Sequence, residues 1–256
     1  MFHTITYERN ESGFSIITLN RPHKRNAITT EMCEELNLAL DLARSDNVKF
    51  LVITGSGVQS FSAGGDLRQF HGNMTNEEAY DLLNKLSTLL LRIVEFPVPT
   101  VALLNGSARG GGCEIASACD FRFAKAGTEF GYVQGNIGVS PGWGGGALLY
   151  RRTNSSFAHY WIASSEMFPA VTLQQQGWVQ HIVREREWGN YDLIFSSFIK
   201  KTRKQMIIFK KQLLYYLNIF KLRKEMEEEV KNCSSLWDTP EHIDAVASFF
   251  QQKGKK

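Results

Sequence analysis

Two glycine-rich segments and one glutamate are the residues of this sequence best suited to chemistry. The segment Phe61–Leu67 reads FSAGGDL, and the segment Asn105–Glu114 reads NGSARGGGCE. Glycines let a ligand approach the backbone closely, and the free N–H groups at a helix start point toward a negatively charged oxygen. Two such turns side by side would hold one developing oxyanion, each donor contributing about 3–4 kcal/mol in the transition state. Tight packing is the alternative explanation, and it accounts less well for three successive glycines followed by an acid.

The acid that follows the three glycines is Glu114. A carboxyl group in the first turn of a helix, beside an oxyanion site, can exchange a proton with a substrate. The competing explanation is stabilisation of the helix dipole, worth about 0.3–1 kcal/mol. We favour proton transfer.

Alternating strand and helix patterns must position these turns. Apolar runs at 50–54 and 99–104 predict buried strands directly before the two glycine-rich segments. Helical spacing of apolar residues predicts a helix over 30–44. The capping box Thr75–Glu78 predicts a second helix that runs to about Val94.

The later part of the chain predicts helices with few strands. Helices are expected over 147–163, from Thr172 with a second capping box, over much of 191–231, and from Pro240 after an N-cap at Thr239. Strands alternating with helices, followed by helices alone, indicate an α/β fold with a helical C-terminal region.

Composition excludes several classes of protein. The chain of 256 residues has 43% hydrophobic and 21% charged residues, which excludes disorder, and no apolar run approaches the roughly 20 residues that span a bilayer. Four cysteines without a CxxC pair, and no signal-peptide pattern, predict a soluble cytoplasmic protein with reduced thiols. The six histidines lack metal-ligand spacing, so no metal is expected. The dinucleotide-like pattern that begins at Gly142 lacks the strand that should precede it.

An ordered series of motifs makes the chain resemble the enoyl-CoA hydratase/isomerase, or crotonase, superfamily. Over about residues 1–185 the motifs are NRPxxRNA from Asn20, FSAGGDL from Phe61, NGxAxGGGCE from Asn105, ACD from Ala118, FG from Phe130, GVxPGxGG from Gly138 and GxV from Gly177. The resemblance implies a spiral of ββα units over 1–190 that carries an acyl-CoA site, and a helical subdomain over 191–256. It implies assembly of this helical region into homotrimers or homohexamers, with coenzyme A as part of the substrate and no separate cofactor.

The resemblance also assigns candidate site residues. The backbone N–H groups of Gly65 and Gly111 match the oxyanion hole, and Glu114 matches the first of two glutamates in family hydratases. Gln134 stands in place of the second glutamate, and an amide cannot transfer protons near neutral pH. Hydration by a carboxylate pair is therefore in doubt. The residues that the resemblance suggests for substrate binding are Lys24, Arg25, Ala63, Asp66, Leu67, Arg68, Gly110 and Trp143.

Enolate chemistry that needs a single acid is therefore expected, in a lyase or isomerase of fatty-acid metabolism. The alternative reaction is decarboxylation of a malonyl-type thioester, methylmalonyl- or ethylmalonyl-CoA, in which loss of CO₂ forms the enolate without a base. The segments Cys119–Arg122 and Pro141–Gly145 resemble the ethylmalonyl-CoA decarboxylase-like branch. Trp143 would then wall an apolar pocket, or else simply fill the core. A non-catalytic relative that binds acyl-CoA or RNA is the remaining alternative.

Charge is unevenly distributed. The segment Lys200–Lys224 holds nine basic residues and no acid, so the net charge of +3 includes −6 from the rest of the chain. The favoured explanation is a helix whose apolar face packs in an oligomer and whose lysines are solvated. A contact with the CoA 3′-phosphate comes next, and RNA binding last.

Overall fold

A six-stranded sheet forms the centre of the computed structural model, which describes residues 2–70 and 74–253. In spatial order its strands are β1 (Ile5–Arg9), β2 (Ser15–Leu19), β3 (Leu51–Gly55), β5 (Thr100–Leu104), β7 (Phe121–Lys125) and β10 (His181–Val183). The hairpin β1–β2 is antiparallel and every later pair is parallel. Every residue of β3 and β5 is buried, as expected for central strands covered on both faces.

A smaller sheet of four strands lies beside the first. Its strands in spatial order are β4 (Ser60–Ser62), β6 (Ser107–Arg109), β8 (Glu129–Gly131) and β9 (Met167–Pro169). The first three are parallel to one another, and each follows a strand of the large sheet along the chain. This repetition of two strands, one in each sheet, is the predicted spiral of ββα units, and the α/β fold class is confirmed.

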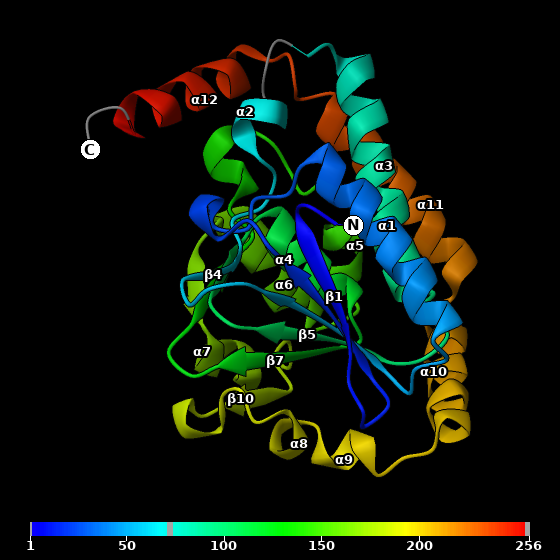
Figure 1. Cartoon of the computed structure of the whole chain (residues 1–256). Coiled ribbons are helices and arrows are strands. Elements are labelled where there is room, and N and C mark those ends of the chain that lie inside the picture. Colours follow the sequence, from blue (N-terminus) through cyan, green and yellow to red (C-terminus); the bar gives the residue numbers. More distant parts are fainter. Residues whose placement is uncertain (1, 71–73, 254–256) are drawn as a thin grey trace.

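Helices pack around the two sheets (Figure 1). On one side α3 (Asn76–Val94) packs against both α1 (Thr30–Ser45) and α11 (Ile219–Ser234). The other helices are α2 (Leu67–Phe70), α4 (Gly111–Ala118), α5 (Gly145–Leu149), α6 (Ser155–Ser164), α7 (Ala170–Gln175), α8 (Tyr191–Ile194), α9 (Ser196–Ile199), α10 (Arg203–Leu217) and α12 (Pro240–Lys253), with the 3-10 turns η1 (Pro22–Lys24), η2 (Gln134–Ile137) and η3 (Glu185–Glu187). Within the described ranges, no helix has both the length and the hydropathy to cross a membrane.

The helix starts show where local sequence signals hold and where they fail. The capping box at Thr75 is confirmed, because its hydroxyl accepts from the Glu78 N–H and the Glu78 carboxylate accepts from the Thr75 N–H. The continuous helix expected over 147–163 is wrong. The side chain of Asn154 caps a new helix there, since it accepts from two N–H groups of the first turn of α6. The start at Thr172 is also wrong, because α7 begins two residues earlier, directly after a proline.

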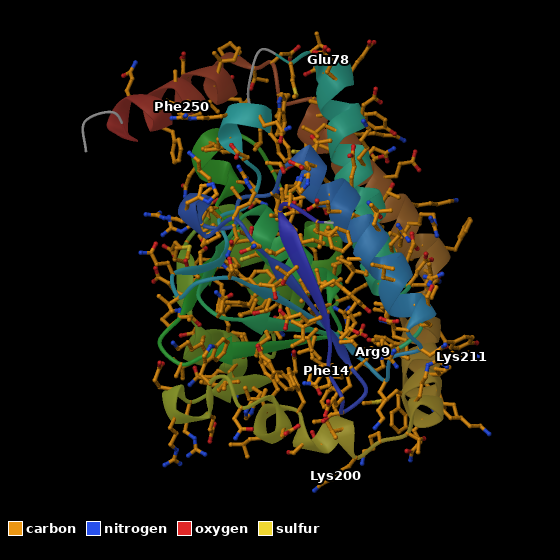
Figure 2. All side chains as sticks on the ribbon, in the orientation of Figure 1. Arg9, Phe14, Glu78, Lys200, Lys211 and Phe250 are labelled. Atoms are coloured by element: carbon orange, nitrogen blue, oxygen red, sulfur yellow. The ribbon has the colours of Figure 1, made fainter. Side chains whose placement is uncertain are left out.

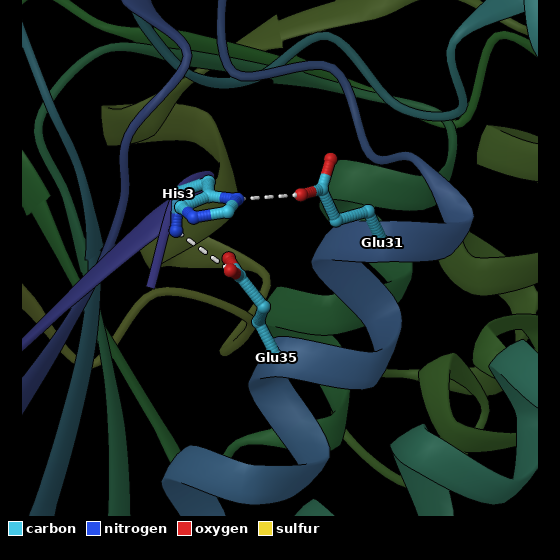
Figure 3. Close-up of side chains that lie close together, drawn as sticks. All are labelled: His3, Glu31 and Glu35. Carbon is cyan, nitrogen blue, oxygen red and sulfur yellow. Dashed lines mark hydrogen bonds and ion pairs between the residues drawn. The ribbon is translucent and has the colours of Figure 1, made fainter. Parts of the chain in front are cut away.

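The N-terminal segment is tied to α1 by a small polar cluster (Figure 3). The carboxylate of Glu35 accepts from the His3 N–H at 2.6 Å, and from the N–H and hydroxyl of Thr4 at 2.8 and 2.6 Å. The His3 ring lies 3.1 Å from a Glu31 oxygen. These acids and the imidazole are close enough to hold a cation, but both oxygens of Glu35 already accept bonds from the chain, so the cluster serves to anchor the strand.

The basic C-terminal stretch contains one cation that is not solvated. Lys210 is 1% exposed, and its Nζ donates to both carboxylate oxygens of Asp120 at 2.7 and 2.6 Å. The expectation that the lysines of this stretch are merely solvated is therefore wrong at this position, although Lys200 and Lys211 do extend from the surface (Figure 2). An ion pair buried in this way fixes α10 against the core.

Candidate active site

A cavity of about 1210 Å³ opens at the edge of the small sheet. Because β4 and β6 are parallel neighbours, the turns that follow them meet at the same edge. Every site residue suggested by the sequence lines this cavity: Lys24, Arg25, Ala63, Gly65, Asp66, Leu67, Arg68, Gly110, Gly111, Glu114, Gln134 and Trp143. The fold therefore gathers in one place residues that are spread over more than a hundred positions of the chain.

The two glycine-rich turns touch each other. Gly64 has a φ of +89°, which favours glycine, and a Cβ built on it would lie 3.2 Å from the backbone nitrogen of Gly111. Gly111 is the first residue of α4, where a backbone N–H has no partner within the helix. Among the described residues, no acceptor is found for the N–H of Gly65 or of Gly111. Two unpartnered donors thus stand on adjacent turns of one cavity.

The indole of Trp143 lies against both of these glycines. A Cβ built on Gly111 would overlap the ring, and a Cβ on Gly65 would lie 3.5 Å from it. Trp143 is 5% exposed and packs edge-to-face on Phe70, with ring centroids 6.4 Å apart. The ring is therefore both part of the core and a wall of the cavity beside the donors.

Glu114 lines the cavity and is buried, in the first turn of α4. Its Oε2 accepts from the N–H groups of Trp143 and Gly145, both at 2.9 Å, and its Oε1 accepts from the Gln134 amide at 2.8 Å. Burial raises the pKa of this carboxyl group, although the hydrogen bonds act in the opposite direction. A raised pKa suits a group that must take up and release a proton near neutral pH.

Gln134 lies in η2, with its side chain next to Gly110. Its Nε2 bonds to Glu114, while its Oε1 is buried and has no hydrogen-bond donor among the described residues. The side chain therefore contacts the candidate acid directly, but as an amide it positions hydrogen bonds and moves no proton.

Two other acids line the cavity, and both are paired. Asp66 forms an ion pair with Arg21 at 3.0 Å, and the same guanidinium donates to the carbonyl of Ala27. Glu31 pairs with the His3 ring at 3.1 Å. Glu114 is thus the lining acid whose hydrogen bonds hold it beside the glycine donors. Arg21 was missed by sequence reasoning, although it belongs to the motif that begins at Asn20.

The basic residues stand at the exposed part of the cavity lining. Lys24, Arg25 and Arg68 are all exposed, and within the described ranges none of them forms an ion pair. Arg109 also lines the cavity and is exposed, and it too forms no ion pair with the described residues, so four such cations there attract an anionic group such as a phosphate.

Residues from the C-terminal helices complete the lining and had no signal in the sequence. They are Cys233 of α11, Trp237 after it, and Phe249 and Phe250 of α12. Figure 2 places Phe250 on α12, which extends over this end of the molecule.

Comparison with known proteins adds to this geometry. The model of the enoyl-CoA hydratase/isomerase family matches residues 9–255. The mouse mitochondrial methylglutaconyl-CoA hydratase is 29% identical over 72% of this chain, and chicken ethylmalonyl-CoA decarboxylase is 34% identical over 60% of it. The matched segments span 58% and 52% of the lengths of those two relatives. An enoyl-CoA hydratase/isomerase structure from Xanthobacter autotrophicus Py2 superposes with a TM-score of 0.88 at 26% identity, covering 98% of this chain and 94% of that one.

Proposed function

The chain belongs to the enoyl-CoA hydratase/isomerase family, and from that premise we propose that it acts on an acyl-CoA thioester through an enolate. The observation that carries the proposal is the pair of N–H groups, on Gly65 and Gly111, that have no acceptor in the described part of the chain and share one cavity with the buried acid Glu114. Donors fixed in advance at the place where charge develops stabilise a transition state strongly.

Each part of the cavity has a role in this proposal. The thioester oxygen accepts from the two glycine N–H groups, which polarise the carbonyl and hold the charge of the enolate. Glu114 exchanges a proton with the acyl carbon chain. Lys24, Arg25 and Arg68 attract the phosphates of coenzyme A at the exposed part of the cavity.

Decarboxylation of a malonyl-type thioester is the second candidate reaction. The bond between the α-carbon and the carboxylate breaks, CO₂ leaves, and the electron pair forms the enolate on the thioester oxygen. The α-carbon then takes a proton from the Glu114 carboxylic acid, which water reprotonates. This reaction needs one acid and no base, and it is favoured by the contact of Glu114 with an amide, Gln134, rather than with a second carboxylate. Similarity to chicken ethylmalonyl-CoA decarboxylase also supports it.

A panel of thioesters tests the proposal. Crotonyl-, 3-hydroxybutyryl-, methylmalonyl- and ethylmalonyl-CoA are incubated with the protein, and products are read by mass spectrometry. We expect turnover of at least one thioester, a loss of about 10²-fold or more in Glu114→Ala, and unchanged CoA affinity of that variant by calorimetry. Binding without turnover of any thioester would instead identify a non-catalytic acyl-CoA-binding relative.

A further inference from the structure

A second carboxylate, from the C-terminal helix α11, holds the turn that carries Trp143. The Oε1 atom of Glu229 accepts from the N–H groups of Gly144 and Gly146 at 2.9 and 3.1 Å, and Oε2 accepts from the Ala147 N–H at 2.7 Å. The carboxylate therefore accepts three backbone bonds at the start of α5. Nothing in the roles proposed above uses it.

Glu229 and Glu114 divide the donors of this turn between them. The N–H groups of Trp143 and Gly145 bond to Glu114, and that of the intervening Gly144 bonds to Glu229. Successive N–H groups thus point to opposite sides, and two carboxylates face each other across one short stretch of backbone. A displacement of the turn on one side must change the hydrogen bonds on the other.

One face of α11 packs against the same turn, from Gly142 to Gly144. A Cβ built on Gly144 would overlap the side chain of Met226, and one on Gly142 would overlap Cys233. Met226, Glu229 and Cys233 are spaced to share one face of a helix. The turn between the two acids therefore rests directly on α11 and has little freedom to move independently.

We propose that Glu229 is a positioning residue for Glu114: it fixes the turn whose N–H groups hold Glu114 and sets a second carboxyl group behind it. The inference concerns the same site as the proposed function and rests on it for the role of Glu114 in turnover. Glu229 itself does not line the cavity, so it acts through the turn and through its charge rather than by touching substrate.

Other titratable groups also surround α11 and are part of the electrostatic environment. On α11 itself these groups are Arg223, Glu225, Lys231 and Cys233. On the neighbouring elements they are Tyr132 before η2, Arg151 after α5, Tyr80 on α3 and Glu95 just after α3. Arg151 pairs with Glu225, Arg223 with Glu95 and Lys231 with Glu227. Burial, followed by the charge of Glu114, raises the pKa of Glu229 to about 8. The two carboxyl groups therefore titrate as a pair.

The variant Glu229→Gln removes the charge and keeps the shape, and Glu228→Gln is its matched control on the exposed side of α11. Because the two carboxyl groups titrate as a pair, ionisation of Glu114 becomes easier when its partner carboxyl group is removed. The limb of the pH–rate profile that reports Glu114 should move to lower pH, by at most about one unit. The direction is the same whether Glu114 acts as acid or as base. A purely structural role would lower the rate at every pH and leave the limb in place, and this result would overturn the proposal.

A second readout does not depend on turnover. In protein labelled with ¹³C at the glutamate carboxyl groups, the Glu114 signal is assigned by its loss in Glu114→Gln. Its titration midpoint should be lower in Glu229→Gln and unchanged in Glu228→Gln. If this shift is seen but no thioester is turned over, the proposed function fails and the coupling stands; turnover without the shift refutes the coupling alone.

A conservative variant covers the case in which Glu229→Gln does not fold. Glu229→Asp shortens the side chain and retains the charge, so the backbone bonds weaken while the repulsion remains. We expect a lower maximal rate with the Glu114 limb close to its wild-type position. If the Glu114 limb moves as far in Glu229→Asp as is expected for Glu229→Gln, the ionisable group at position 229 does not determine the position of the limb. That result would overturn the proposal.

Discussion

Replacement of Gln134 by glutamate tests whether this side chain decides the reaction. Its Nε2 lies 2.8 Å from Oε1 of Glu114, so Gln134→Glu would set two carboxyl groups in contact, where they share one proton and leave one ionised as a base for water. General-base activation of water contributes about 10²–10⁴-fold. We therefore expect crotonyl-CoA hydration to rise by about 10²-fold, which corresponds to about 2.7 kcal/mol in the barrier.

The same substitution makes stability depend on pH. It removes the amide donor from Glu114 and adds a like charge, and both changes raise the carboxyl pKa values of the folded state above those of the unfolded chain. The folded protein then binds more protons than the unfolded chain, so the free energy of unfolding falls as pH rises above about 4.3. We expect a loss of about 1–3 kcal/mol at pH 8 relative to wild type, and a much smaller loss at pH 5.

Two assays check this prediction: loss of the enoyl thioester absorbance, and thermal unfolding at the two pH values. Asn136→Asp is the matched control, because Asn136 is an exposed amide in the same turn, η2, and does not line the cavity. A folded Gln134→Glu variant whose hydration remains negligible would refute Gln134 as the missing element. An equal loss of stability at both pH values would refute the electrostatic part of the reasoning.

Three further substitutions test other parts of the structure. Trp143→Ala removes the ring that lies against the donor glycines, so the ratio of kcat/KM for long over short acyl chains should rise about tenfold, with a stability loss of about 3 kcal/mol in urea unfolding. Lys210→Met strips Asp120 of its closest buried partner and should cost about 3 kcal/mol in the same assay. Glu35→Gln removes an acid whose pKa is lowered, since bonds from Thr4 and from the His3 N–H outweigh the opposing effect of burial. The stability that ionised Glu35 provides is lost as pH falls through its folded-state pKa, so the variant should show a flatter loss of Tm in acid than wild type.

Matched controls separate these effects from general damage. Lys211→Met, an exposed neighbour, should change stability by less than about 0.5 kcal/mol. Glu34→Gln, exposed on the same helix as Glu35, should keep the wild-type acid dependence. An unchanged chain-length ratio in Trp143→Ala would show that the indole fills the core without limiting the acyl chain.

The strands and turns that present the glycines were predictable because their signals are local. Apolar runs end at glycines, and the ordered motifs up to Trp143 include most residues of the cavity. The contribution of α11 was not predictable. Glu229 is one of several acids in the run Glu225–Glu229, and the sequence alone does not indicate which of them turns inward. Packing of the helix against the core determines which acid is buried. The same holds for Lys210, which the sequence does not distinguish from the other lysines of the basic stretch and which the fold places beside Asp120.

The bond from Gly144 to Glu229 joins residues 85 positions apart, so the turn is synthesised well before the helix that supports it. At about 5–20 residues per second, the ribosome needs about 4–17 s to add the segment between them. The last strand of each sheet, β9 and β10, is translated during that interval, while the turn beside Trp143 has only the Glu114 side of its support. A nascent chain that stalls before Glu229 would therefore carry the glycine turns in an incompletely supported site, and it would leave the surface meant for α11 open to chaperones or to aggregation.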